Sequence, residues 1–377
     1  MRKNIIKTMK SIKMIGLTLG APFDLHTRSG VNYNIFTRFK NKVDLIDVFD
    51  LDIKGTKKIL GVIRSFSFNR RRWGNKLHQS PWAFKVRTSL AEQKIEELSG
   101  KPELIFQDGA MFMPGREPKV PFVSYHDGNV ILSAQGGNFA HGAHYKGGKL
   151  AKTIAQEKMV YEKAALIFSM SDWLKKSFVH DFGIPEEKII TVYAGTNLKV
   201  EDFDKNYDSK TILFVGKNFE RKGGKALLEA FKLVRKEIKG AKLIIIGPNL
   251  NIKEEGVEVK GLITNKEELS KYFREASLFA LPSLFEPFGI VFAEAFAFKN
   301  PCIGSNICAM PEIIEEGKGG FLVSPNDYKK LADRLLLLLK DENLLRKMGN
   351  YGYEKVKNVF NWNAVVDKML FHCSRIV

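Results

Sequence analysis

Two carboxylates, Glu286 and Glu294, lie eight positions apart in the apolar run LFALPSLFEPFGIVFAEAFAF. Pro287 and Gly289 suit a chain that turns from a strand into a helix, and the residues that follow are apolar on every side. Such a helix is buried, and Glu294, about two turns from its start, would need a partner there. The arrangement predicts an anion at the helix N-terminus and a hydroxyl-rich group near each carboxylate.

A nucleotide-sugar has this layout, with ribose, diphosphate and hexose in order. Two other interpretations stay open. In one, Glu294 pairs with a neighbouring Lys or Arg, and Glu286 is only a charge at a helix start. In the other, the carboxylates are the acid and base of a glycoside hydrolase, whose inverting members keep these groups about 6.5 to 9.5 Å apart. A hydrolase, however, has no use for a phosphate-binding loop.

Such a loop is predicted by KNFERKGG, which lies between the apparent strand TILFVG and an amphipathic helix from about Lys225. Free backbone N–H groups and the positive end of the helix dipole favour an anion there. Lys217, Arg221 and Lys222 add positive charge. No Ser or Thr follows Lys222, so the loop is no Walker A motif, and the chain contains no GxGxxG. A solvated basic turn is the competing interpretation.

The elements that must position these side chains are short apolar runs separated by segments of helical periodicity. The runs are MIGLTL, VDLIDVFDL, ELIFQDG, PFVSYHD, ALIFSMS, IITVYAG, TILFVG, KLIIIG, VEVKGLI, LFALPS, NPCIGS and GFLVSP. Strands covered on both faces have such consecutive apolar residues, which predicts an α/β fold with parallel sheets. The pattern occurs on both sides of the polar stretch 197–210. We therefore expect two Rossmann-like domains facing each other across a central cleft.

The composition of the chain agrees with this organisation. A length of 377 residues suits two domains, and the net charge of +18 favours an anionic partner. The three cysteines lack metal-ligand spacing, which indicates a reducing compartment and no zinc site. The basic N-terminus has too short an apolar stretch for a secretion signal, and no run is long enough to span a membrane. We expect a cytoplasmic protein, with peripheral attachment to the inner face of the membrane as an extension.

The motifs of the second half resemble those of the retaining GT-B glycosyltransferases of family 4, also called glycosyl transferases group 1. The likeness covers about residues 212–327 and includes FVGKNFERKGGKALLEAF, the EPFGIVFAE spacing and MPEIIEEGKGGFLVSPND. It extends to LADRLLLLLKDENLLRKMG, which we expect to be one helix over 331–349. The resemblance implies a GT-B fold, with an acceptor domain over 1–200 and a donor domain over 208–357. A C-terminal helix over 358–377 is a candidate to pack back on the first domain.

The resemblance also implies a site. Lys217 and Lys222 would neutralise the donor diphosphate, Glu294 would bind ribose, and Glu286 would bind the donor sugar. TRSGVN, with Gly30, and SYHDGN, with His126, are the weaker matches in the first half. The implied catalytic residues are Glu286, Lys222, Lys217 and His126. The implied donor-binding residues are Gly30, Gly216, Lys217, Arg221, Lys222, Glu286, Phe288, Gly289, Ile290 and Glu294.

The implied reaction moves a hexose from a nucleoside-diphosphate sugar, UDP or GDP, with retention of configuration. It needs no cofactor and no metal, because the cations and the helix N-terminus stabilise the departing diphosphate. The family's glycine-rich positions read Lys299-Asn300-Pro301 and Cys308-Ala309-Met310 here, which leaves the donor open. A GT-B epimerase or phosphorylase, or a non-enzymatic basic module, are the rival classes.

The acceptor is sought in the segment 53–91, which has ten Lys or Arg and no Asp or Glu. Its candidate contacts are Arg64, Arg70, Arg71, Arg72 and Trp73. Basic and aromatic residues together suit a saccharide or lipid-linked acceptor on an anionic membrane. They also suit nucleic acid, and a solvated basic helix pair with core aromatics is the third interpretation. The loop 133–149 holds His141 and His144, but two ligands do not make a metal site, and its glycines suit an acceptor lid.

Overall fold

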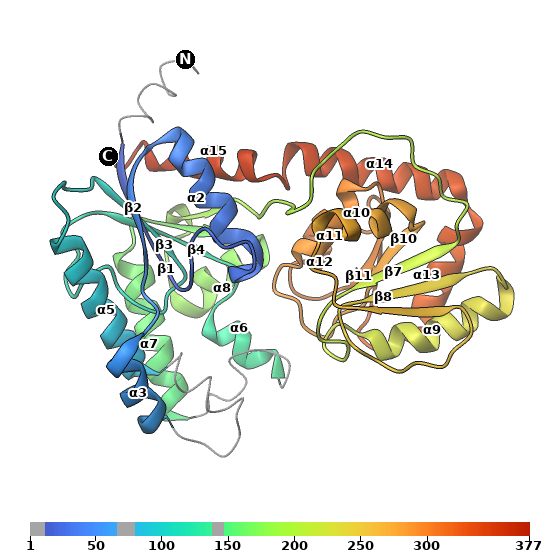
Figure 1. The fold of residues 1–377 in the computed structure, drawn as a ribbon, viewed down its shortest axis with the longest axis horizontal. Coiled ribbons are helices and arrows are strands. Elements are labelled where there is room, and N and C mark those ends of the chain that lie inside the picture. The colour runs from blue at the N-terminus through green and yellow to red at the C-terminus, as the bar shows by residue number, and fades with distance from the viewer. Residues whose placement is uncertain (1–11, 66–79, 138–146) are drawn as a thin grey trace. The chain divides into compact units, whose positions relative to one another are not determined.

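The computed structural model describes residues 12–65, 80–137 and 147–377, and these form two compact units (Figure 1). The N-terminal unit contains the described residues up to Tyr193 together with Trp362–Val377. The C-terminal unit is Ala194–Asn361. Among the described residues, no helix is long and apolar enough to cross a membrane.

The N-terminal unit is built on a parallel six-stranded sheet in the order β2-β1-β3-β4-β5-β6. Its strands are β1 (Lys13–Thr18), β2 (Asp44–Asp50), β3 (Leu104–Asp108), β4 (Phe122–His126), β5 (Leu166–Ser169) and β6 (Ile189–Thr191). Its helices are η1 (Thr27–Gly30), α2 (Val31–Lys42), α3 (Gly55–Arg64), α5 (Pro81–Glu96), α6 (Val130–Gln135), α7 (Gly148–Lys163), α8 (Asp172–Phe182), η3 (Glu186–Lys188) and α15 (Trp362–Cys373). The strand order reverses between β1 and β3, and open sheets of this kind bind ligands at such a switch point.

The C-terminal unit repeats this plan with a parallel sheet in the order β12-β11-β10-β7-β8-β9. Its strands are β7 (Thr211–Val215), β8 (Lys242–Ile246), β9 (Val257–Gly261), β10 (Leu278–Leu281), β11 (Cys302–Ser305) and β12 (Gly320–Val323). Its helices are α9 (Gly224–Glu237), α10 (Lys266–Glu275), α11 (Ile290–Ala297), α12 (Met310–Ile314), α13 (Tyr328–Lys340) and α14 (Glu342–Asn358). Here the switch point falls between β7 and β10.

The predicted α/β fold with two parallel sheets is confirmed, and each of the twelve apolar runs forms one of the twelve strands in the described part of the chain. Most strand residues are buried because helices cover both faces of each sheet (Figure 1). In the C-terminal unit α9 packs on α13, and α11 packs on α14. In the N-terminal unit the last helix, α15, packs on α2, where Arg38 donates to Asn363 over 3.0 Å.

Two local predictions were wrong. The expected helix over 331–349 is two helices, because Asp341 leaves the helical conformation and its side chain caps α14 by accepting a hydrogen bond from the Leu344 N–H at 2.9 Å. Glu294 was expected two turns into its helix, but it is the fifth residue of α11, only about one turn from the start. Glu294 is therefore closer to the helix N-terminus than expected.

Candidate functional site

Two loops meet at the switch point of the C-terminal sheet, one after β7 and one after β10. The Leu284 N–H donates to the Arg221 carbonyl at 2.8 Å, which joins their backbones. Gly223 has φ +75°, and a Cβ there would lie 1.8 Å from the Pro282 carbonyl oxygen. Only glycine fits this contact, so the sequence KGG is what allows the two loops to touch.

This contact brings Lys222 and Glu286 together. The Lys222 ammonium forms an ion pair with Glu286, and both residues are buried. Arg221 approaches the same carboxylate oxygen at 3.4 Å and also donates to the Phe285 carbonyl at 2.8 Å. Burial lowers the pKa of Lys222, and the Glu286 carboxylate opposes that change. The structure thus gathers three of the predicted residues into one nearly buried cluster with two cations and one anion.

Glu294 lies on α11 and is partly buried. Asn197 donates a long hydrogen bond to it, 3.4 Å, and no Lys or Arg side chain among the described residues forms an ion pair with it. Burial raises the pKa of Glu294, with Asn197, Lys266 and Lys222 acting in the opposite direction. The alternative that a neighbouring cation satisfies Glu294 by a direct ion pair is therefore wrong, and the carboxylate keeps acceptor capacity for a hydroxyl group.

The turn between the two glutamates has the predicted shape. Gly289 caps α11 with φ +81°, and Ile290 is the first helical residue. A side chain at Gly289 would come within 2.8 Å of the Phe292 ring and 3.1 Å of the Glu286 Cγ. Phe288 is buried against Phe360, with ring centroids 6.2 Å apart. Phe288 packs against Phe360, and Gly289 has no side chain. The backbone N–H groups at the start of α11 therefore stay available for hydrogen bonding.

The remaining members of the predicted phosphate loop lie where β7 ends. Lys217 is exposed and forms no ion pair with any residue that the structure describes. Gly216 lies beside Gly247, which has φ +119°, and against the Lys222 side chain. Lys217 is thus free to reach a ligand, while Lys222 is fixed by its surroundings.

The N-terminal unit has its own polar cluster at the switch point between β1 and β3. Arg28 donates to Asp108 at 2.9 Å and lies 3.6 Å from Asp127. Arg28 and Ser29 both have left-handed backbones, with φ 50° and 55°, and Gly30 follows with φ 78° at the start of α2. Two such non-glycine residues in succession are unfavourable. They place the partly exposed Arg28 side chain against the buried Asp108.

Sequence reasoning found Gly30 in this cluster but missed Arg28 and Asp108. Asp108 also accepts from the Thr18 hydroxyl at 3.4 Å, and Thr18 in turn accepts from Asn32. Asp108 is the last residue of β3, and residues at the carboxyl ends of parallel strands meet at one edge of the sheet, so its position carried a signal. Arg28 lies in η1, beyond the end of β1, and carried no such signal.

His126 is the last residue of β4 and lies inside the N-terminal unit. Its ring packs edge-on against Tyr161 and Phe178, with centroids 5.2 and 5.5 Å away. Burial lowers the pKa of His126 to about 3, so the imidazole is neutral at physiological pH. Its Nε2 has no hydrogen-bond partner among the residues that the structure describes. A neutral imidazole can act as a hydrogen-bond partner for a ligand, but it is no cation for the diphosphate.

Of the predicted acceptor residues, Arg64 is exposed at the end of α3. Arg70, Arg71, Arg72 and Trp73 lie outside the described residues, as do His141 and His144. The segment 80–91 belongs to α5, where Phe84 is buried in the core.

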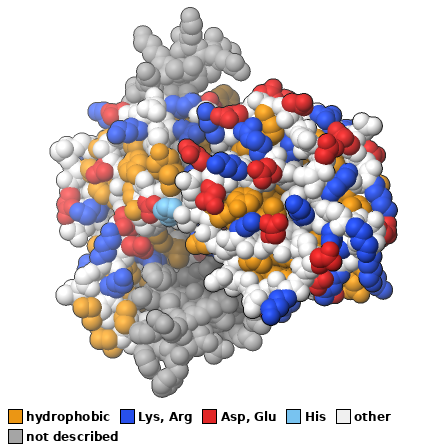
Figure 2. Space-filling view, turned by 45° about the vertical axis from the view of Figure 1, so that its right-hand side comes forward, with side chains coloured by type: hydrophobic (Ala, Val, Ile, Leu, Met, Phe, Trp, Pro, Cys, Tyr) orange, Lys and Arg blue, Asp and Glu red, His pale blue; other side chains and the backbone are white. Residues whose placement is uncertain are grey.

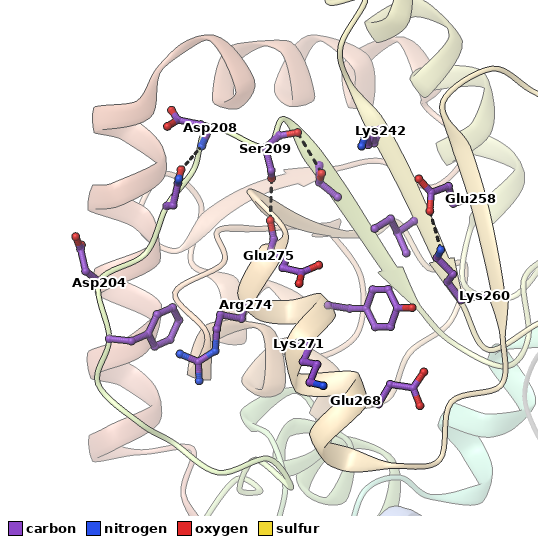
Figure 3. Close-up of a pocket in the computed structure, with 15 residues that line it drawn as sticks. Asp204, Asp208, Ser209, Lys242, Glu258, Lys260, Glu268, Lys271, Arg274 and Glu275 are labelled. Atoms are coloured by element: carbon purple, nitrogen blue, oxygen red, sulfur yellow. Dashed lines mark hydrogen bonds and ion pairs between the residues drawn. The ribbon is translucent and has the colours of Figure 1, made fainter.

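A pocket of about 970 Å³ lies elsewhere in the C-terminal unit (Figure 3). Thr211 and Lys242 line it, and these residues begin β7 and β8, so the pocket lies toward the amino ends of the strands. Figure 3 shows acidic and basic side chains mixed around it, with Lys260 joined to Glu258. Parallel sheets bind ligands at the opposite, carboxyl ends of their strands. We therefore assign the pocket no part in the site formed by Lys222 and Glu286.

The chain is an α/β protein with two parallel sheets and a polar cluster at the switch point of each. Its residues 196–355 match the family model described as "Glycosyl transferases group 1". The match covers nearly all of the C-terminal unit and contains the whole Lys222 and Glu286 cluster.

Similar proteins extend this finding. The chain is 30% identical over 207 residues to N-acetyl-alpha-D-glucosaminyl L-malate synthase of Bacillus anthracis, an alignment that covers 50% of this chain and 54% of that protein. The chain thus spans about half the length of this curated relative.

Solved structures share the fold over almost the whole chain. Sucrose-phosphate synthase from Thermosynechococcus elongatus aligns with a TM-score of 0.69 at 17% identity, covering 97% of this chain and 99% of that one. The Anabaena HepE protein in complex with UDP and glucose aligns with a TM-score of 0.67 at 14% identity, covering 96% and 99%. At these identities the likeness confirms the predicted GT-B fold and nothing finer.

Proposed function

We propose that this protein is a glycosyltransferase that moves a hexose from a nucleoside-diphosphate sugar to an acceptor hydroxyl. The observation that carries the proposal is the buried cluster of Lys222, Arg221 and Glu286 at the switch point of the C-terminal sheet. It combines positive charge for a diphosphate with a carboxylate for sugar hydroxyls. The match of residues 196–355 to the group 1 glycosyltransferase family model supports it.

The donor is assigned to the C-terminal unit. In this proposal Lys222 and the exposed Lys217 neutralise the diphosphate, assisted by the N–H groups at Gly289 and Ile290. Glu286 accepts hydrogen bonds from the hexose. Glu294, which has no ion pair with a described Lys or Arg, accepts them from the ribose. UDP or GDP is the expected nucleotide, and UDP is supported by the similar HepE fold in complex with UDP and glucose.

The reaction is proposed to retain anomeric configuration without a metal. The proposal assigns no covalent nucleophile to the cluster, in which Glu286 is ion-paired with Lys222 and Arg221. The acceptor hydroxyl therefore attacks from the face that the nucleoside diphosphate leaves, and the leaving phosphate helps to accept its proton. The main contribution of the protein is to stabilise negative charge on that phosphate by Lys222, Lys217 and the start of α11.

The acceptor is assigned to the N-terminal unit, as a saccharide or a lipid-linked glycan. Arg28, Asp108 and Asp127 surround the carboxyl ends of β1, β3 and β4 there, and polar and charged side chains of this kind bind hydroxyl groups. His126 is neutral, and no residue in the described part of the chain hydrogen-bonds its Nε2; it is proposed to contact the donor sugar. Gly30 is proposed to bring the backbone at the start of α2 to the diphosphate.

A panel of UDP-, GDP-, ADP- and CDP-hexoses tests the proposal by thermal shift. Binding to the native state raises the melting temperature, and at a fixed ligand concentration the shift grows with the logarithm of the affinity, so one nucleotide series should stand out. Its shift should persist with EDTA present. The absence of a shift with every sugar in the panel would count against the proposed function as a whole.

A further inference from the structure

The helix α3 of the N-terminal unit is amphipathic in an unusual sense, since its apolar side faces outward. Ile59, Leu60 and Ile63 are 62%, 49% and 67% exposed, whereas Gly61 is the buried residue of the helix. With about 3.6 residues per turn, the three apolar side chains fall within one arc of roughly 100°, on the side opposite Gly61. Hydrophobic side chains reach the surface at the lower end of this unit in the space-filling view (Figure 2).

This exposure is not the ordinary scatter of surface apolar residues. Single exposed leucines are common on soluble proteins, but three large aliphatic side chains on one helical arc mark an interaction surface. We call Ile59, Leu60 and Ile63 the α3 apolar face. Gly61 is the buried residue of α3, so the three apolar side chains lie away from the covered side of the helix.

Positive charge borders the α3 apolar face. Lys57, Lys58 and Arg64 are exposed, and none of them forms an ion pair with a described residue. The helix itself contains no acidic residue. Lys57 and Arg64 fall next to Leu60 on the helical wheel, at the edge of the apolar arc. The surface therefore presents apolar side chains bordered by unpaired cations.

We propose that the α3 apolar face inserts into the interfacial region of an anionic phospholipid bilayer. A helix with exposed aliphatic side chains on one arc and cations beside them suits a fluid interface, into which an amphipathic helix sinks its apolar side while its cations meet anionic headgroups. A second copy of this chain is a poorer occupant, because self-association through the same face would bring like charges together. The proposal rests on the proposed function, because it places the acceptor domain at a membrane. Vesicle binding is measured without donor or acceptor, so the two proposals can fail separately.

Vesicle co-sedimentation of the full chain tests this proposal. Wild type is compared on phosphatidylcholine vesicles and on vesicles that contain about a third phosphatidylglycerol. The test variant is Ile59→Asp with Ile63→Asp. The matched control is Leu262→Asp with Leu337→Asp, two leucines of the C-terminal unit that are 58% and 43% exposed. Each variant replaces two exposed aliphatic residues by aspartate, so the two variants have the same net charge.

We expect wild type to bind the anionic vesicles, the test variant to bind them at least tenfold more weakly, and the control to stay within about threefold of wild type. A protein with Ile59→Trp should show blue-shifted fluorescence on anionic vesicles, as expected when an indole enters the interface. Equal binding by the test variant and wild type would overturn the proposal, as would failure of wild type to bind. A change in oligomeric mass caused by the test variant would assign the face to self-association instead.

Discussion

Lys222 and Glu286 form a buried ion pair across the two loops that follow β7 and β10. The strands are neighbours in the sheet although 64 residues separate the two side chains, and the Leu284 to Arg221 hydrogen bond fixes one loop against the other. A charged pair held in this way needs little rearrangement to meet a ligand. This preorganisation is what makes electrostatic stabilisation of a developing charge effective.

Replacement of Glu294 by glutamine should weaken donor binding more than it slows the chemical step. Glutamine keeps the size of the side chain but loses the carboxylate, which we assign to the ribose hydroxyls far from the reacting bond. We expect the KM for the donor to rise about tenfold with kcat within about threefold of wild type, the behaviour of a contact made equally in ground and transition states. A large fall in kcat with unchanged KM would contradict the ribose assignment.

Gly223→Ala should strongly destabilise the C-terminal unit. The residue has φ +75°, and a Cβ would lie 1.8 Å from the Pro282 carbonyl oxygen. Backbone strain and overpacking each cost about 1 to 3 kcal/mol, so we expect a loss of roughly 3 kcal/mol in the free energy of unfolding. Gly240→Ala is the control, because a Cβ there meets open space. Urea unfolding of the two variants measures the difference, and similar stabilities would contradict the close loop contact.

Glu157→Gln should stabilise the protein at neutral pH. Glu157 accepts from the Val130 N–H at 2.9 Å and the Tyr161 hydroxyl at 3.0 Å, and burial raises its pKa to about 7. The folded state therefore binds more protons than the unfolded state between about pH 4.5 and 7, and the contribution of Glu157 to stability is lost as pH rises through that range.

Glutamine keeps the acceptor oxygen without the buried charge. We expect the variant to gain about 1 to 2 kcal/mol over wild type at pH 8, after allowance for partial exposure of the side chain, and little at pH 4.5. Thermal unfolding at both pH values measures the gap. A gap that does not change with pH would show that Glu157 does not titrate in this way.

Lys205→Met should remove a pH dependence of the opposite sign. Lys205 is buried and donates to the carbonyls of Phe273 and Arg274, both at 2.8 Å, and to Asn300 at 3.0 Å. Burial lowers its pKa to about 7. Between about pH 7 and 10.5 the unfolded state then binds more protons, so the contribution of Lys205 makes stability rise with pH.

Methionine cannot titrate, so the variant should lack this rise. The unfolding midpoints of wild type and variant are compared between pH 7 and 9.5. Titration of other groups affects both proteins alike, so it cancels when one midpoint is subtracted from the other. Parallel pH profiles of the two proteins would contradict the lowered pKa of Lys205.

The fold was predictable from the sequence because buried parallel strands are apolar on consecutive residues, and each of the twelve such runs is a strand. The site was predictable as a set of residues but not as a set of contacts. Glu286 and Lys222 were both expected in it, yet their mutual ion pair depends on β7 and β10 being neighbours, which local patterns do not specify.

Arg28 and Asp108 were missed for the same physical reason, because their contact joins residues that are distant in the sequence. Arg28 pairs with Asp108, 80 residues away, and the local sequence around either residue does not specify that pairing. Asp341 is different, because a cap residue followed by Glu342 at the start of a helix is a local signal that could have divided the predicted helix over 331–349. The apolar side of an amphipathic helix usually faces the core, but that of α3 faces outward. The sequence pattern is the same in both cases, so only the exposure of each side chain in the structure distinguishes them.

The most direct test of the central claim is the turnover of Lys222→Ala with the nucleotide-sugar that the thermal-shift panel selects. Lys225→Ala is the control, since Lys225 is an exposed residue that pairs only with Glu220 among the described residues. Loss of one preorganised contact to a developing charge lowers turnover by about 10² to 10³, and we expect that loss for Lys222→Ala and near wild-type turnover for the control. Turnover of Lys222→Ala within about threefold of wild type would contradict the assignment of Lys222 to the leaving diphosphate.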